Sequence, residues 1–196
     1  MGSTDFRFNL GRLSLNFVGT VGSRNSEHPV ERWPTVARLT EWLAQSGIVR
    51  PGDALPALDA ADLQRFIALR EALHRLVHDV VHHRKPSPGD LAFVNAAARE
   101  AHPPVLQLAG VRRGTAWEVS TAEPLTAAQV LATVARDAID LIGGPDRALL
   151  RECAGGTCDG IYVDRSRGFN RVWCASTACG NDTRVKRFRL KAAAQH

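Results

Sequence analysis

The sequence predicts a mainly α-helical protein of the α+β class. A helical N-terminal domain with one β-hairpin is expected to precede a small, treble-clef-like zinc finger. Three observations indicate this arrangement. Long segments carry apolar residues at helical spacing between recognisable start and stop residues. Two short apolar stretches flank a glycine turn. All four cysteines of the 196-residue chain lie within its last 44 residues.

Four segments have the pattern of amphipathic helices: 36–49, 59–84, 90–101 and 126–142. Asp59 or Asp62 is placed to cap the second helix, and Thr126 is placed to cap the fourth. Glycine or proline lies at or just beyond the end of each segment, where a helix commonly stops. The N-terminal part of the chain is therefore expected to be a helical domain.

Shorter segments of this part are expected to be extended. Alternating apolar residues at Leu13, Leu15 and Phe17 favour a strand over a short helix. Residues 105–108 and 116–119 flank an Arg-Arg-Gly turn and predict the β-hairpin. The Gly-Gly-Pro sequence at 143–145 is the best candidate boundary, which gives domains 1–145 and 146–196.

The net charge of +5 belongs entirely to the C-terminal part. Residues 151–196 hold nine Lys and Arg against four Asp and Glu, so residues 1–150 hold sixteen of each and are neutral. Localised positive charge on a small module attracts phosphate groups. The chain has no pattern of a secretory signal and no apolar run of membrane-spanning length. We therefore expect a cytoplasmic protein with reduced thiols and no membrane partner.

The cysteines form two closely spaced pairs, Cys153-x4-Cys158 and Cys174-x4-Cys179, separated by 15 residues. Such pairs predict a tetrahedral Zn²⁺ site, with disulfides or unmetallated thiols as the alternatives. Gly155 and Gly156 are expected to adopt positive φ angles that turn amides toward the sulfurs. Because four thiolates fill the coordination sphere, no hydrolytic zinc-bound water and no enzyme are expected.

Between and after the cysteine pairs, the expected layout is a hairpin followed by a helix. The stretches 161–163 and 171–173 have the composition of two strands that pair with each other. Residues 182–194 have the pattern of a basic helix. Two knuckles, a hairpin and a helix are the layout of a treble-clef-like finger.

These motifs resemble those of the bacterial CGNR zinc-finger proteins, whose N-terminal region is the stress-associated ABATE domain. The resembling residues are Cys153-x4-Cys158, Val163-Asp164-x-Ser166-Arg167, Arg171-x-Trp173-Cys174 and Cys179-Gly180-Asn181. Upstream, the segment 13–20 resembles the opening motif of the family, and it carries Asn16 and Gly19 where an acid and an asparagine are usual. The resemblance implies a zinc-containing, DNA-binding transcription regulator. The arginine that closes the family's name motif is Asp182 in this chain.

The predicted DNA contacts are the basic side chains of the finger loop and of the last helix. On that helix Arg184, Arg187 and Lys191 share one face, and Phe188 on the opposite face is expected to pack onto the zinc module. The complete set of candidates is Arg165, Arg167, Arg171, Arg184, Lys186, Arg187, Arg189 and Lys191. The alternative is a solvated basic surface, or one that binds a protein partner.

Two features of the N-terminal domain have a second interpretation. His74, His78 and His82 recur every four residues, a spacing that lets two histidines bind one metal ion, but no partner helix rich in His or Asp is apparent. A polar helix face is therefore favoured. The tryptophans 33, 42 and 117 are expected in the core rather than around a ligand.

The N-terminal domain leaves further functions open: it could bind a small-molecule effector or form a homodimer. The alternative function is a small-molecule-binding protein or enzyme in which the four-cysteine zinc site is purely structural.

Overall fold

A computed structural model describes residues 5–111, 117–185 and 188 of the chain, without the side chains of 109–111, 117 and 118. Its helices are α1 (Leu13–Val18), α2 (Val36–Gln45), α3 (Ala60–Val81), α4 (Pro88–Arg99) and α5 (Ala127–Gly143), followed by a 3-10 helix (Pro145–Leu149) and a π-helix (Ser176–Gly180). Three two-stranded antiparallel sheets accompany them: β1 (Val21–Gly22) with β2 (Val30–Glu31), β3 (Leu106–Val111) with β4 (Trp117–Thr121), and β5 (Leu150–Glu152) with β6 (Ile161–Val163). The mainly helical fold class is confirmed.

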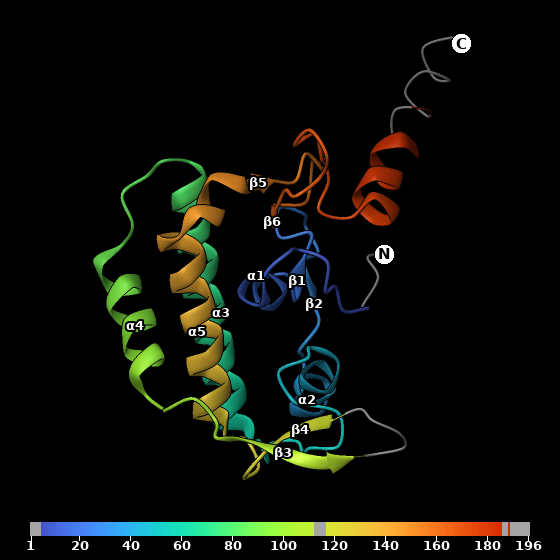
Figure 1. The fold of residues 1–196 in the computed structure, drawn as a ribbon. Helices are drawn as coiled ribbons and strands as arrows, with labels where there is room; N and C mark the ends of the chain where they lie inside the picture. Colours follow the sequence, from blue (N-terminus) through green and yellow to red (C-terminus); the bar gives the residue numbers. More distant parts are fainter. Residues whose placement is uncertain (1–4, 112–116, 186–187, 189–196) are drawn as a thin grey trace.

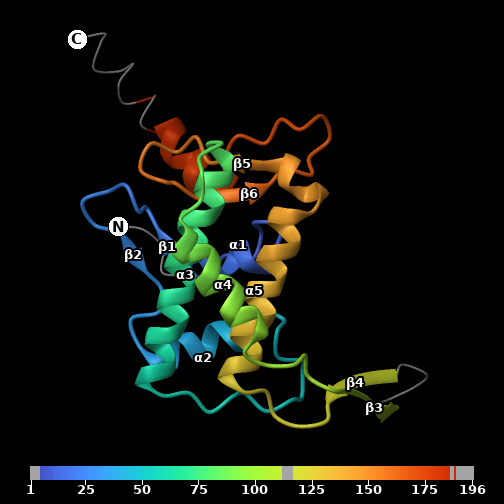
Figure 2. The same cartoon turned by 90° about the vertical axis from the view of Figure 1, so that its left-hand side faces the viewer.

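Helices α3, α4 and α5 lie side by side and form the body of the protein (Figure 1). The segment that contains α1 and α2 covers one side of this layer. The turned view in Figure 2 places the β3–β4 hairpin at one end of the long helices and the cysteine-containing finger at the other. The finger therefore sits on top of α3 and α5, where residues from both helices can contact it.

The long helices form where the sequence predicts them because their start signals are local. The Asp59 side chain accepts a hydrogen bond from the Asp62 backbone N–H, and Thr126 and Gln129 form a second capping box. Helix α4 begins earlier than predicted, because Ser87 caps it and a proline occupies its first position. The predicted β-hairpin is also present, with Leu106 opposite Thr121 and a bulge beyond Leu108.

The predicted strand at Leu13, Leu15 and Phe17 is wrong, because these residues belong to helix α1. The reason lies far away in the sequence. One carboxylate oxygen of Asp137 on α5 accepts hydrogen bonds from the Ser14 backbone N–H at 2.8 Å and from its hydroxyl at 2.6 Å. This carboxylate satisfies the start of α1, where the helix has no cap from its own neighbouring side chains. The alternation of apolar residues over a few positions gives no information about that long-range contact.

The larger of two hydrophobic clusters is built around aromatic rings. Trp33 and Trp42 are fully buried with ring centroids 5.2 Å apart, and Phe17 packs edge-on against both. These two tryptophans are therefore core residues, as predicted, whereas the Trp117 side chain lies outside the described part. The second cluster joins Leu10, Leu15, Val77 and Leu141 to apolar residues of the finger, so the helices and the finger share a core.

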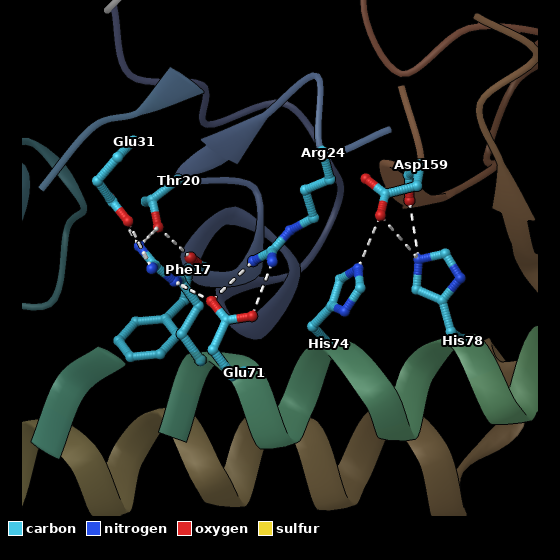
Figure 3. Close-up of polar contacts among 9 residues, drawn as sticks. Phe17, Thr20, Arg24, Glu31, Glu71, His74, His78 and Asp159 are labelled. Carbon is cyan, nitrogen blue, oxygen red and sulfur yellow. Dashed lines mark hydrogen bonds and ion pairs between the residues drawn. The ribbon is translucent and has the colours of Figure 1, made fainter. Parts of the chain in front are cut away.

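Partly buried ion pairs hold the β1–β2 segment against α3 (Figure 3). Arg70 is 2% exposed, and its guanidinium donates to both carboxylate oxygens of Glu31 and to Glu71. Arg24 donates two further hydrogen bonds to Glu71, at 2.7 and 3.0 Å. Burial alone would raise the pKa of Glu71, but its hydrogen bonds and charge interactions with Arg24 and Arg70 outweigh burial and lower the pKa to about 2.

Across the described residues, no helix combines the length and the apolar character needed to cross a lipid bilayer.

Replacement of Asp137 by alanine should lower the free energy of unfolding by about 2 to 3 kcal/mol, because two donors of Ser14 lose their acceptor while Ser14 itself stays buried. The free energy is measured by urea denaturation followed by circular dichroism. Asp140→Ala on the exposed face of the same helix is the matched control and should change it by less than about 0.5 kcal/mol. Equal effects of the two substitutions would contradict the capping role.

Glu71 should make stability depend on acid pH. A carboxylate whose pKa falls from 4.5 to about 2 on folding contributes stability that is complete above pH 4.5 and is lost as the pH falls toward 2. The urea midpoint of the wild type should therefore fall more steeply over this range than that of Glu71→Gln. Glu123→Gln, at an exposed position, should follow the wild type. Parallel curves for all three proteins would contradict this assignment.

Candidate metal centre and basic surface

The four cysteines converge on one point. Their Sγ atoms all lie within 4.8 Å of one another, with 3.6 Å between Cys158 and Cys174 and 3.5 Å between Cys174 and Cys179. All four cysteines are free, and these separations far exceed the roughly 2.05 Å of a disulfide. A tetrahedral ion with Zn–S bonds near 2.3 Å needs sulfurs about 3.8 Å apart. The donor set and its spacing therefore fit a metal ion such as Zn²⁺.

Local turns bring the first cysteine pair together. The Cys158 backbone N–H donates to the Gly155 carbonyl at 2.9 Å, and the Cys153 N–H donates to the Gly160 carbonyl at 2.9 Å. These two bonds fold the loop back so that both sulfurs face the same point. The second pair comes from the segment after Trp173, where Cys179 belongs to the short π-helix.

The predicted pairing of 161–163 with 171–173 is wrong, because β6 pairs with β5 instead, with Leu150 opposite Val163 and Glu152 opposite Ile161. Side-chain and loop contacts hold 171–173 in a different path. The buried Asp164 carboxylate accepts from the Arg171 backbone N–H at 3.1 Å and from Ser166. The carbonyl of Val172 accepts from the Ala154 N–H at 3.0 Å. Asp164 thus shapes the finger loop through hydrogen bonds to its backbone.

Glycines near the sulfurs act through space rather than through backbone angle. The expected positive φ angles of Gly155 and Gly156 are wrong, because neither residue lies in the left-handed region. A Cβ atom on Gly160 would lie 3.3 Å from the Cys158 Sγ and 3.4 Å from the Cys174 Sγ. The Gly160 backbone N–H also points at the Cys158 Sγ, at 3.4 Å between nitrogen and sulfur. A side chain at this position would crowd the ligand sulfurs, which would have to shift by a few tenths of an ångström to accept it.

The N-terminal segment contributes to this site, which the sequence did not reveal. The guanidinium of Arg7 lies 3.8 Å from the Cys174 Sγ, so a positive charge faces a cluster that becomes negative when it binds a metal ion. The Leu10 carbonyl accepts from the Val163 N–H at 2.9 Å, and the Asn16 side chain fixes the Leu10 N–H at 3.0 Å. Asn16, one of the two departures from the family motif, thus holds the segment that touches β6.

Two of the predicted DNA-contacting arginines are held by contacts within the protein. The Arg171 guanidinium donates to the backbone carbonyls of Trp173, Asn9 and Cys174 and stacks 4.2 Å above the Tyr162 ring. Arg165 donates to the Gly11 carbonyl and pairs with Asp146. Both side chains therefore brace the finger, and their predicted contact with DNA stays a prediction.

Two other arginines face solvent. Arg167 lies at an exposed position of the finger loop, and no ion pair joins it to another residue in the described ranges. Arg184 lies in the helical stretch 181–185, where its guanidinium bonds the Asn181 side chain and the Ser176 carbonyl and lies 5.9 Å over the Trp173 ring. Lys186, Arg187, Arg189 and Lys191 lie outside the described residues.

The expectation that Phe188 packs onto the zinc module is wrong, because its side chain is 74% exposed. Val185 on the same stretch is 46% exposed. The apolar residues that the finger buries include Ile161, Tyr162 and Val163, which belong to the second hydrophobic cluster. Helical periodicity identifies the apolar face of this stretch. It does not show whether another part of the protein offers a surface against which that face can pack.

A helical body that carries a compact four-cysteine finger defines a protein of the zinc-finger class. Comparison with family models gives the particular family. The ABATE family, described as "Putative stress-induced transcription regulator", matches residues 11–145, and the CGNR zinc finger matches residues 149–192. The chain therefore belongs to the ABATE family and carries a CGNR zinc finger. A comparison with curated proteins found no match.

A methyl group at residue 160 should weaken the metal site. Gly160→Ala forces Cys158 or Cys174 to move, so the affinity for Zn²⁺ should fall roughly tenfold, equivalent to about 1.4 kcal/mol. Affinity is measured by competition with a coloured chelator. Gly156→Ala is the control, because a Cβ atom there meets no atom within 4 Å, and it should bind as the wild type does. A Gly160→Ala protein with unchanged affinity would contradict the crowded geometry.

Proposed function

We propose that this protein is a DNA-binding transcription regulator whose finger is folded by Zn²⁺ bound to Cys153, Cys158, Cys174 and Cys179. The observation that carries the proposal is that the sulfur cluster lies in the segment that holds the whole net positive charge, residues 151–196. Membership of a family described as "Putative stress-induced transcription regulator" supports it. Such a protein acts in the cytoplasm, where thiols stay reduced.

The proposed role of zinc is structural. The ion would join the β5–β6 side of the finger, through Cys153 and Cys158, to the segment of Cys174 and Cys179. Its binding free energy is then folding free energy for the finger. Four thiolates leave no open coordination position for a reactive water, so the proposal assigns the protein no catalytic reaction.

The proposed DNA surface begins at Arg167 and Arg184. Arg167 is exposed on the loop between the cysteine pairs, and Arg184 is held at the start of the terminal basic stretch. The bonds of Arg184 to Asn181 and Ser176 both use one nitrogen, Nη2, of a guanidinium that carries five N–H donors. Phosphate groups are the natural partners of such donors. The basic residues at 186, 187, 189 and 191 continue the positive charge along the chain.

A second candidate function rests on a cavity of about 640 Å³ at the α3–α4 face. Its wall includes Leu69, Phe93 and Leu131. The charged members of the wall are Arg65, Arg99 and Glu100. A volume of this size and a mainly apolar wall suit a small organic ligand. The protein would then bind a small molecule, either as the effector of a regulator or as its sole function above a purely structural finger.

DNA binding should be strongly salt-dependent and should need both the finger and its arginines. For a mixed-sequence DNA duplex, log affinity should fall linearly with the logarithm of the salt concentration. The slope should become less negative by about 0.9 for each phosphate contact removed by Arg167→Ala or Arg184→Ala. Arg38→Ala on α2, at the far end from the finger, removes the same charge and should leave the slope unchanged (Figure 1). Cys174→Ser should abolish binding together with tightly held zinc.

The same variants separate the two candidate functions in cells. Loss of the transcriptional response with Arg167→Ala and Arg184→Ala, but not with cavity-filling Ala97→Phe, supports the DNA-binding proposal. The reverse result, together with wild-type protein that shows no affinity for duplex DNA at low salt, supports the small-molecule candidate in which the finger only braces the fold.

A further inference from the structure

Helix α3 presents two histidines to a loop of the finger (Figure 3). His74 and His78 are one helical turn apart, with ring centroids separated by 4.5 Å. Asp159, the finger residue directly after Cys158, faces both rings. The Nε2 atom of His74 is 2.9 Å from the Asp159 Oδ2, and the Nε2 atom of His78 is 2.9 Å from the Asp159 carbonyl oxygen.

The donor atoms of these three residues have the spacing of a metal site. One ring nitrogen from each histidine and one carboxylate oxygen all lie within 4.8 Å of one another. The Asp159 Oδ2 is 2.9 Å from His74 and 3.9 Å from His78, whereas ligands about 2.0 Å from a tetrahedral ion are separated by about 3.3 Å. The observed distances bracket that value, so small side-chain rotations would place all three donors around one ion.

The surroundings favour a cation. The three side chains are only 20, 11 and 11% exposed, and they line a polar cavity of about 380 Å³ that leaves room for a water molecule as a further ligand. Two arginines also line this cavity, but Arg75 pairs with Asp90 and Arg84 pairs with Asp79. Their charges are therefore compensated locally, and the carboxylate of Asp159 faces the histidines.

We propose that His74, His78 and Asp159 bind a second divalent transition-metal ion, of the Zn²⁺ class, separate from the four-cysteine centre. Two imidazoles and one carboxylate are a donor set that such ions accept. The ion would fasten α3 to the finger through the residue that adjoins Cys158. Its binding would not require that the finger binds DNA.

The Nε2 atom of His78 carries a proton where it donates to the Asp159 carbonyl oxygen, so metal binding would replace this hydrogen bond and release that proton.

A second possible set of metal ligands shares His78 and provides a matched control. His78, His82 and Glu152 also bring three donors within 4.8 Å of one another. His82 is 42% exposed and Glu152 is 31% exposed, so this set is more open to water than the one that contains Asp159. A substitution at His82 removes this second set and leaves the proposed one intact.

The test counts ions on the full-length chain loaded with excess Co²⁺ and freed of unbound metal. Wild type should hold two ions, of which one shows intense thiolate-to-cobalt absorption and the other shows only the weak bands of nitrogen and oxygen ligands. His74→Gln combined with His78→Gln should hold one ion and keep the thiolate absorption. The matched control His82→Gln should hold two.

One ion in the wild type, a second ion that survives the double substitution, or its loss in His82→Gln would each overturn the proposal. Should the double variant be unfolded by circular dichroism, nitrogen NMR of the wild-type histidine rings decides instead. A second equivalent of Zn²⁺ must shift the rings of His74 and His78 and leave those of the exposed His28 and His102 unchanged. Absence of thiolate absorption would count against the four-cysteine site and not against this one.

Discussion

A finger of about 50 residues buries too little apolar surface to be stable by itself, and this constraint organises much of the structure. The finger is held from inside by the convergence of four sulfurs and from outside by the helices. Ile161 and Val163 complete a hydrophobic cluster with Leu15 of α1 and Leu141 of α5. The ends of the long helices are therefore not free surface, because the finger packs against them.

The N-terminal segment adds a second attachment to the same module. The Leu10 carbonyl bonds β6, and a Cβ atom on Gly11 would lie 3.0 Å from the Val163 Cβ. Arg7 adds a charge beside Cys174. The two family models divide the chain near residue 147, but packing and hydrogen bonds cross that division in several places. A change in how the helical body packs is thus felt directly by the finger, without any intervening linker.

Features that depend on neighbouring residues could be predicted from the sequence, and features that depend on distant partners could not. The capped helices α3 and α5, the β3–β4 hairpin and the four cysteines follow from local spacing and turn residues. Helix α1 depends on Asp137, 123 residues away from Ser14, and the pairing of β6 depends on contacts that redirect residues 171–173. The histidines of α3 illustrate the same limit. Their acidic partner is not on a neighbouring helix but is Asp159, 85 residues beyond His74.

The contact of the first residues with the last module has a consequence for the order of folding. A chain is synthesised from its N-terminus, and Arg7 and Leu10 find their partners only when residues more than 150 positions later have emerged. Until then the N-terminal segment lacks its contacts with the finger. The hydrophobic cluster around Leu15 also lacks the residues that the finger contributes to it. The helical body can form early from local contacts. The packing of the finger onto the ends of α3 and α5 needs contacts that are distant in the sequence, so it comes late and is expected to be the slow part of folding.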